Sequence, residues 1–161
     1  MSIFMVHAMH PGSSIMQLET PVAQDLLSPC LALDKRPTVL IVEDDHDVRE
    51  AITVILECAG YESAGAADGA QAMQMLHAGL RPGLIVLDLM LPVLDGWQFR
   101  QEQRRHAEFE SIPTIVCSAL GDAERHAMRL GAVAGLTKPL DVDMLLALAE
   151  RYCRREPLET G

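Results

Sequence analysis

Short apolar runs alternate with segments of helical periodicity over most of the chain. Residues 39–42, 84–87 and 114–117 are apolar at nearly every position, which is typical of central strands covered by helices on both sides. Weaker runs at residues 61–66 and 136–137 complete a set of five. This repeated strand–helix order predicts an α/β fold, a doubly wound five-stranded parallel sheet flanked by five helices.

The helical segments carry recognisable start and stop signals. Apolar residues recur with helical spacing from Val48 to Ala59, where Asp45 or Asp47 can serve as the N-cap and Gly60 ends the helix. Further helices are predicted from residue 70 to near Gly79 and over residues 97–106, 122–130 and 142–152.

Residues 1–37 differ from the rest of the chain. Four methionines occupy the first 16 positions, four prolines follow along the segment, and no periodicity is sustained. We therefore predict a disordered N-terminal extension at 1–37, one domain at 38–156 and a short C-terminal tail at 157–161. No effector segment is visible after the domain, so we expect it to act alone.

Charge and hydropathy exclude several classes of function. The chain has 23 acidic and 13 basic residues, a formal net charge of −10, so we expect no nucleic-acid partner. No apolar stretch is long enough to span a membrane, and the N-terminus lacks a signal peptide. The four cysteines lack the paired spacing of a metal or redox site, so we expect them to act as small apolar residues in a reducing compartment. We expect a cytoplasmic protein with no membrane contact.

Polar residues follow four of the five predicted strands. Glu43 and Asp44 come after the first strand, Asp88 after the third, Ser118 after the fourth and Lys138 after the fifth. The carboxyl ends of parallel strands meet at one edge of a sheet, and ligands bind there at the point where the strand order reverses. Three carboxylates, a hydroxyl and an ammonium group are therefore expected in one crevice.

Each of these residues also has an ordinary structural interpretation. An aspartate after a strand is frequently a helix cap, a serine there is usually a turn residue, and a lysine is often a solvated charge. However, Lys138 is the only lysine after residue 35 in a chain that otherwise uses arginine. A compact charge on a flexible stem suits a site better than a bare surface, and the joint pattern favours a site.

Charge balance in this crevice indicates a cation. Glu43, Asp44 and Asp88 repel one another unless their pKa values rise or a cation joins them. Oxygen ligands with room for water suit Mg²⁺. Asp88 could attack a phosphoryl donor, with Mg²⁺, Lys138 and Ser118 holding the phosphoryl oxygens, because phosphoryl transfer depends mainly on positioning and charge neutralisation.

Four sequence motifs together resemble the response-regulator receiver domain of bacterial two-component signalling, which has a flavodoxin-like fold. The resemblance extends over about residues 38–155. Its motifs are VLIVEDD at 39–45, LIVLDLMLPVLDGW at 84–97, PTIVCSA at 113–119 and LTKP at 136–139.

The resemblance implies a role for each matching residue. It makes Asp88 the phosphoacceptor, Ser118 the switch hydroxyl and Lys138 the lysine that contacts the phosphoryl group. It also implies an Mg²⁺ site whose ligands are Glu43, Asp44, Asp88 and the main-chain carbonyl of Met90. It further implies a cis peptide bond at Lys138–Pro139 and a loop after Asp88 shaped by Pro92 and Gly96.

The same resemblance implies partners and a limited catalytic role. A histidine kinase or a histidine phosphotransfer protein would donate the phosphoryl group, and the output would be contact with an unidentified protein target or service as a phosphate sink. At most, the chain would phosphorylate itself from phosphodonors and slowly lose the group. Met90 and Leu120 are apolar and cannot hydrogen-bond the water that would attack the acyl phosphate. We therefore expect a long-lived phosphoryl group.

One position departs from the family pattern. Many receivers carry an aromatic residue three positions before the lysine, where this chain has Gly135. We therefore expect a conformational response that is smaller or follows a different route, through the loop after the fourth strand.

Two alternatives differ in class. A phosphorylation-independent scaffold would keep the fold without the switch; Gly135 favours it and the complete acidic set opposes it. An aspartyl phosphohydrolase would have a second aspartate two residues after the nucleophile, where this chain has Met90.

Overall fold

The computed structural model describes residues 37–153 of a chain that divides into units of residues 1–35 and 36–161. The predicted extension at 1–37, except Pro37, and the predicted tail at 157–161 lie outside the described residues. Residues 154–156, the end of the predicted domain, also lie outside them. The three domain boundaries therefore stay predictions.

The five strands form one parallel sheet, as the apolar runs predict. The strands are β1 (Thr38–Val42), β2 (Glu62–Ala66), β3 (Leu84–Asp88), β4 (Thr114–Ser118) and β5 (Ala134–Thr137). Their order across the sheet is β2-β1-β3-β4-β5. The chain steps outward from β1 to β2 and then returns to the other side of β1, so the strand order reverses between β1 and β3. Ligand crevices in such sheets lie outside the carboxyl ends at this point.

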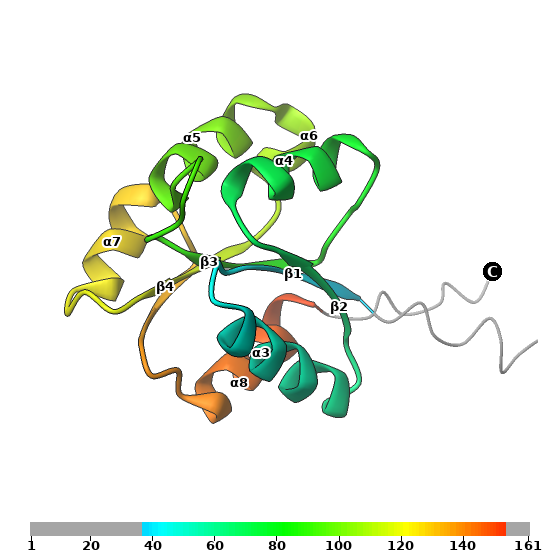
Figure 1. The fold of residues 1–161 in the computed structure, drawn as a ribbon, viewed down its shortest axis with the longest axis vertical. Helices are drawn as coiled ribbons and strands as arrows, with labels where there is room; N and C mark the ends of the chain where they lie inside the picture. The colour runs from blue at the N-terminus through cyan, green and yellow to red at the C-terminus, as the bar shows by residue number, and fades with distance from the viewer. Residues whose placement is uncertain (1–36, 154–161) are drawn as a thin grey trace, which may run out of the picture. The chain divides into compact units, whose positions relative to one another are not determined.

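Helices cover both faces of the sheet (Figure 1). One face carries α3 (His46–Cys58) and α8 (Val142–Tyr152), and the other carries α4 (Gly69–His77), α5 (Gly96–Arg105), α6 (Ala107–Glu110) and α7 (Ala123–Leu130). The predicted fold class is confirmed. The described residues contain one helix more than the five predicted, because the segment after α5 forms the four-residue α6.

The additional helix follows a break in the backbone. His106 adopts an extended conformation, with φ −102° and ψ 111°, which ends α5. The chain then makes one further helical turn, and this turn places Phe109 in the core, where its side chain is fully buried. Burial of this ring against its neighbours stabilises a helical turn that is too short to be stable alone.

Aspartates cap most of the helices and settle an alternative left open by the sequence. Asp45, rather than Asp47, caps α3: its side chain accepts hydrogen bonds from the main-chain N–H groups of Asp47 and Val48. Asp68, Asp95 and Asp141 cap α4, α5 and α8 in the same way. Gly131 ends α7 with a φ of 61°, a conformation that glycine adopts without strain.

The core is divided between the two faces of the sheet. Residues of β1 and β3 alternate between two apolar clusters; Val39 and Ile41 face α3 and α8, whereas Leu40 and Val42 face α4 and α5. Val116 of β4 belongs to a third, smaller cluster with Leu89 and residues of α7. Two of the cysteines, Cys117 and Cys153, are buried free thiols. Burial raises the pKa of Cys117 to about 12, so it is an inert part of the core. No helix among residues 37–153 is long and apolar enough to cross a lipid bilayer.

Candidate functional site

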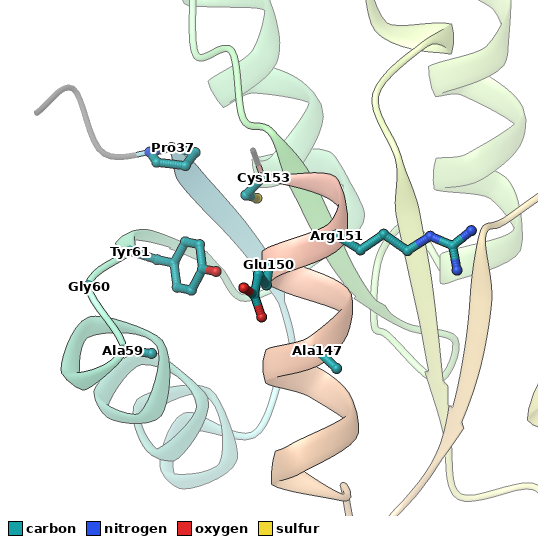
Figure 2. Close-up of a pocket in the computed structure, with 8 residues that line it drawn as sticks. All are labelled: Pro37, Ala59, Gly60, Tyr61, Ala147, Glu150, Arg151 and Cys153. Atoms are coloured by element: carbon teal, nitrogen blue, oxygen red, sulfur yellow. The ribbon is translucent and has the colours of Figure 1, made fainter. Parts of the chain in front are cut away.

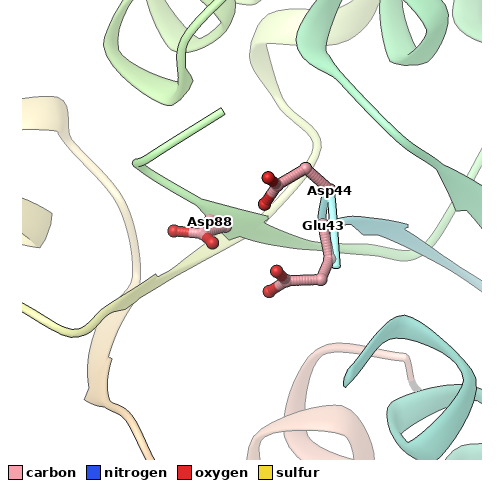
Figure 3. Close-up of side chains that lie close together, drawn as sticks. All are labelled: Glu43, Asp44 and Asp88. Atoms are coloured by element: carbon pink, nitrogen blue, oxygen red, sulfur yellow. The ribbon is translucent and has the colours of Figure 1, made fainter. Parts of the chain in front are cut away.

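Three carboxylates meet at the carboxyl edge of the sheet, where the strand order reverses. Glu43 and Asp44 directly follow β1, and Asp88 is the last residue of β3 (Figure 3). One oxygen from each carboxylate lies within 4.8 Å of the others. Glu43 and Asp88 are buried, with 2% and 5% of their surfaces exposed, whereas Asp44 is open to solvent. The structure therefore brings together the three carboxylates that the sequence predicts at one edge of the sheet.

Lys138 enters the same cluster from the end of β5. Its Nζ donates hydrogen bonds to Oε2 of Glu43 at 2.6 Å and to Oδ2 of Asp88 at 2.7 Å. The peptide bond from Lys138 to Pro139 is cis, as the family resemblance implies. The ammonium group therefore bridges the two buried carboxylates and leaves the exposed Asp44 to one side.

Burial and charge shift the pKa values of two of these groups. Burial raises the pKa of Glu43, and the neighbouring Asp88 adds to the increase, while Lys138 opposes it. Burial alone would lower the pKa of Lys138, but its hydrogen bonds to Asp88 and Glu43 outweigh this effect and raise the pKa. Lys138 is thus held as a cation at neutral pH.

The donor set fits a divalent metal ion. With the three carboxylates ionised and Lys138 protonated, the cluster carries a charge of about −2, which one divalent cation neutralises. The donors of the cluster are carboxylate oxygens, and the exposed Asp44 leaves room on one side for water. Mg²⁺ prefers these features, since it binds few protein carboxylates and keeps several waters.

The loop after Asp88 is fixed from both ends. The main-chain N–H of Met90 donates a hydrogen bond to Oδ1 of Asp88 at 3.0 Å. At the other end, Gly96 lies so close that a Cβ there would stand 2.4 Å from the main-chain oxygen of Asp88. Glycine is therefore required where α5 meets this strand. The predicted role of the Met90 carbonyl as a metal ligand stays a prediction.

Ser118 lies beside the cluster at the end of β4. Its hydroxyl is buried and accepts a hydrogen bond from the main-chain N–H of Leu120 at 3.0 Å. Its carbonyl accepts a hydrogen bond from the main-chain N–H of Lys138 at 2.9 Å. The residue is thus joined to the lysine through the backbone, while its hydroxyl bonds within its own loop. Its predicted role as a switch stays a prediction.

At Gly135, the backbone of α7 packs directly on β5. A Cβ at this position would stand 2.2 Å from the main-chain oxygen and 2.3 Å from the carbonyl carbon of Ala123. These distances leave no room for any side chain unless α7 shifts. The aromatic group absent from the sequence is therefore replaced by the first turn of α7.

Sequence reasoning did not identify two arginines that tie different elements together, one at the site and one away from it. Arg49 of α3 donates a hydrogen bond from Nη1 to the main-chain oxygen of Glu43 at 2.6 Å. Arg100 of α5 is buried and donates to the main-chain oxygens of Leu130 and Gly131, at the end of α7, at 3.2 and 2.7 Å. Both contacts join residues of different elements, and a periodic pattern carries no signal for them.

A cavity of about 640 Å³ opens at the opposite, amino-terminal edge of the sheet. Pro37, Tyr61 and Cys153 line it, and Glu150 points into it while Arg151 points away (Figure 2). The acidic cluster lies at the other edge, so this cavity is separate from the predicted site.

A family model for the response regulator receiver domain matches residues 39–150. The chain belongs to this family. Within the match, the receiver domain carries the acidic cluster, the serine and the lysine described above.

Curated relatives of this receiver domain include larger regulators. The chain is 39% identical over 121 residues to the DNA-binding dual master transcriptional regulator RpaA of Synechocystis, an alignment that covers 74% of this chain and 50% of that protein. It is 37% identical over 122 residues to a protein-glutamate methylesterase/protein-glutamine glutaminase of Cereibacter sphaeroides, covering 73% of this chain and 32% of that protein. The chain therefore matches about half or less of these relatives' lengths.

Solved structures of receiver domains share the fold. A response regulator from Chloroflexus aurantiacus aligns with a TM-score of 0.70 and 32% identity, covering 75% of this chain and all of that one. The receiver domain of a sensor histidine kinase from Pseudomonas aeruginosa, described with a magnesium ion in its active-site cleft, aligns with a TM-score of 0.66 and 28% identity. That alignment covers 74% of this chain and 99% of the other.

Proposed function

We propose that this receiver domain accepts a phosphoryl group on Asp88 from a histidine kinase or a histidine phosphotransfer protein. The contact that supports this proposal best is the bridge from Lys138 to Asp88 and Glu43, at 2.7 and 2.6 Å. An ammonium group held between two buried carboxylates can stabilise the negative charge that builds on the oxygens of a transferred phosphoryl group.

The chemical step is a transfer between two proteins. An oxygen of the Asp88 carboxylate forms a bond to phosphorus while the phosphorus–nitrogen bond of the donor's phosphohistidine breaks, and the imidazole leaves with the electron pair. Lys138 stabilises the negative charge on the transferred oxygens, and Ser118 hydrogen-bonds one of them after its loop moves. The step requires no general base, because the attacking carboxylate is already ionised.

We propose Mg²⁺ as the cofactor, held by Glu43, Asp44, Asp88 and the main-chain carbonyl of Met90. When bound, the ion neutralises phosphoryl oxygens and orients them for in-line transfer. The charge of about −2 on the cluster and the grouping of its oxygens within 4.8 Å support this proposal. The magnesium ion in the related receiver of Pseudomonas aeruginosa also supports it.

A second feature supports docking of a donor protein beside Lys138. A cavity of about 440 Å³ opens between α3 and the loop after β5, and Lys138 and Asp47 are its polar edge. The rest of its wall is apolar: Val48, Ala51, Ile52, Ile55, Pro139, Leu140, Val142 and Leu145. Such a surface suits contact with another protein.

The output that we propose is contact with a protein target, or service as a phosphate sink. RpaA, the relative named as DNA-binding, is about twice the length of the match, and this chain carries excess acidic charge. The stand-alone organisation, the cytoplasmic location and the absence of a nucleic-acid partner stay predictions. So does the long lifetime of the phosphoryl group, which we expect from the exposed apolar side chains of Met90 and Leu120.

Incubation with acetyl phosphate, with and without Mg²⁺, tests the proposal. Intact mass spectrometry should show the addition of one phosphoryl group that requires Mg²⁺. Asp88→Asn should remove the addition, whereas the matched variant Asp143→Asn, at an exposed position on α8, should keep it. A chain that stays unmodified, or an Asp88→Asn variant that is still modified, would contradict the proposal.

Gly135 supports a second candidate, a scaffold that works without phosphorylation. The backbone contact between Gly135 and Ala123 leaves no space for the aromatic residue that many receivers use. The same mass measurement separates the two candidates, because a scaffold has no requirement for modification at Asp88.

A further inference from the structure

Arg49 lies beneath the acidic pair and contacts its main chain. Nη1 of Arg49 donates hydrogen bonds to the main-chain oxygen of Glu43 at 2.6 Å and to that of Asp44 at 3.4 Å. The first of these is short, as expected for a charged donor. Both carbonyls lie past Val42, the last residue of β1 and of the paired register with β2. The N–H of Glu43 still bonds to the main-chain oxygen of Ala66 in β2 at 3.0 Å, and the guanidinium group holds the two carbonyls that follow this bond.

The side chain of Asp44 depends on this main-chain support. Glu43 is anchored by Lys138 at 2.6 Å and accepts a weaker bond from the N–H of Asp45 at 3.3 Å. Among the described residues, in contrast, no hydrogen bond or ion pair is found for the Asp44 carboxylate, which is open to solvent. The direction of that carboxylate is then set by the backbone of residues 43–44, which Arg49 holds.

The neighbouring strand leaves space for the arginine. Gly65 of β2 lies under its stem, and a Cβ at that position would stand 3.1 Å from Cδ and 3.4 Å from Nε of Arg49. Gly65 is exposed and its backbone is in an ordinary strand conformation, where a β-branched residue is usually favoured. Helix α3 thus supplies the guanidinium group, and the glycine of β2 leaves the space that its stem occupies.

We infer that Arg49 is a positioning residue for the metal site, which orients Asp44 by holding the main-chain oxygens of Glu43 and Asp44. The inference rests on the proposed Mg²⁺ site. No hydrogen bond or ion pair joins Arg49 to the carboxylates among the described residues, and a single nitrogen, Nη1, bonds to both carbonyls. Groups that orient metal ligands in this indirect way commonly change metal affinity by 10- to 100-fold.

Calorimetric titration of MgCl₂ into the full chain tests the inference without any phosphorylation. Arg49→Gln should weaken Mg²⁺ binding about tenfold, and Arg49→Lys, which keeps a charged donor on a different stem, should recover at least part of that loss. The matched control Arg125→Gln, at an exposed arginine on α7, should bind Mg²⁺ like the wild type. Equal affinities for Arg49→Gln and the wild type would overturn the inference.

A second variant approaches the same contact from the other strand. Gly65→Val keeps the charge of Arg49 but displaces its stem, so it should also weaken Mg²⁺ binding, even though valine favours a strand. In the double variant, the two losses should not add, because both act through one contact. Unchanged affinity in Gly65→Val, or fully additive losses, would overturn the inference.

The titration also separates this inference from the proposal beneath it. If the wild-type chain itself binds no Mg²⁺, the proposed cofactor is wrong. If the wild type binds and the Arg49 and Gly65 variants bind equally well, only the role of Arg49 is wrong.

Discussion

Two regions at the same edge of the sheet are built in opposite ways. The acidic cluster joins the ends of β1, β3 and β5 through charged side chains, and Lys138 bridges Glu43 and Asp88 at 2.6 and 2.7 Å. The contact of α7 with β5 contains no side chain at Gly135, and the backbone of Ala123 fills the space. In the first region electrostatics sets the geometry, and in the second region close packing does.

This difference indicates that chemistry and response can be separated by mutation. Substitutions in the acidic cluster should change phosphorylation with modest effects on packing. Substitutions at the contact of α7 with β5 should change stability and conformational response while the cluster remains able to accept a phosphoryl group.

The largest expected effect is on chemistry. Lys138→Met removes the cation that bridges Glu43 and Asp88, and it should slow phosphorylation by acetyl phosphate about 100-fold, as removal of a charge-stabilising group commonly does. A time course of intact mass measures the rate, and circular dichroism confirms that the variant is folded. Gly135→Ala serves as the control and should keep a rate close to that of the wild type. An unchanged rate in Lys138→Met would contradict the role given to the lysine.

Packing should show the opposite pattern. In Gly135→Ala the new methyl group would meet the main chain of Ala123, so we expect the free energy of unfolding to fall by about 1–3 kcal/mol. Gly121→Ala is the matched control, since no atom lies within 4 Å of a Cβ there, and it should change stability by less than about 0.5 kcal/mol. Urea denaturation measures both. Equal stabilities for the two variants would show that the contact of α7 with β5 is loose.

The acidic cluster should also show a pH dependence that the packed contact lacks. Burial raises the pKa of Glu43 above its ordinary value of 4.5, aided by Asp88 and opposed by Lys138. The folded protein then holds this proton more tightly than the unfolded chain, so wild-type stability falls as the pH rises from 4.5 through the folded pKa.

Glu43→Gln removes this titration, so its stability relative to the wild type should increase over the same pH range. Urea denaturation with EDTA present, repeated at several pH values, gives the comparison. Parallel stability profiles for the two proteins would mean that the pKa of Glu43 is not raised.

The smallest expected effect is the conformational response itself. Because β5 carries no aromatic side chain at Gly135, beryllofluoride should shift amide resonances mainly in residues 118–124, which lead from Ser118 into α7. Spectra with Mg²⁺ alone provide the reference. Large changes confined to β5 and α8 would contradict this route.

Most of the fold follows from local patterns in the sequence. Unbroken apolar runs at residues 39–42 and 84–87 predict central parallel strands, and the reversal of strand order then brings Glu43, Asp44 and Asp88 together. The feature that the patterns did not predict depends on contacts between distant residues. The short helix α6 depends on burial of Phe109, for which a periodic pattern gives no signal.

The supporting contacts of the site were less accessible to prediction. In the sequence, Arg49 is an ordinary helix residue, and its role appears only when α3 lies against the end of β1. Gly135 shows in the sequence only that an aromatic residue is missing, whereas the structure shows that α7 occupies the space. Both features depend on distances between elements, which residue type and spacing do not specify.

Peptide mapping of the phosphorylated chain tests the central claim most directly. Borohydride reduction converts an aspartyl phosphate into homoserine, so the modified residue can be located by tandem mass spectrometry after reaction with acetyl phosphate and Mg²⁺. The account predicts a single homoserine at position 88, dependent on Mg²⁺. Modification at position 44 or 45 instead, or no modification at any aspartate, would contradict it.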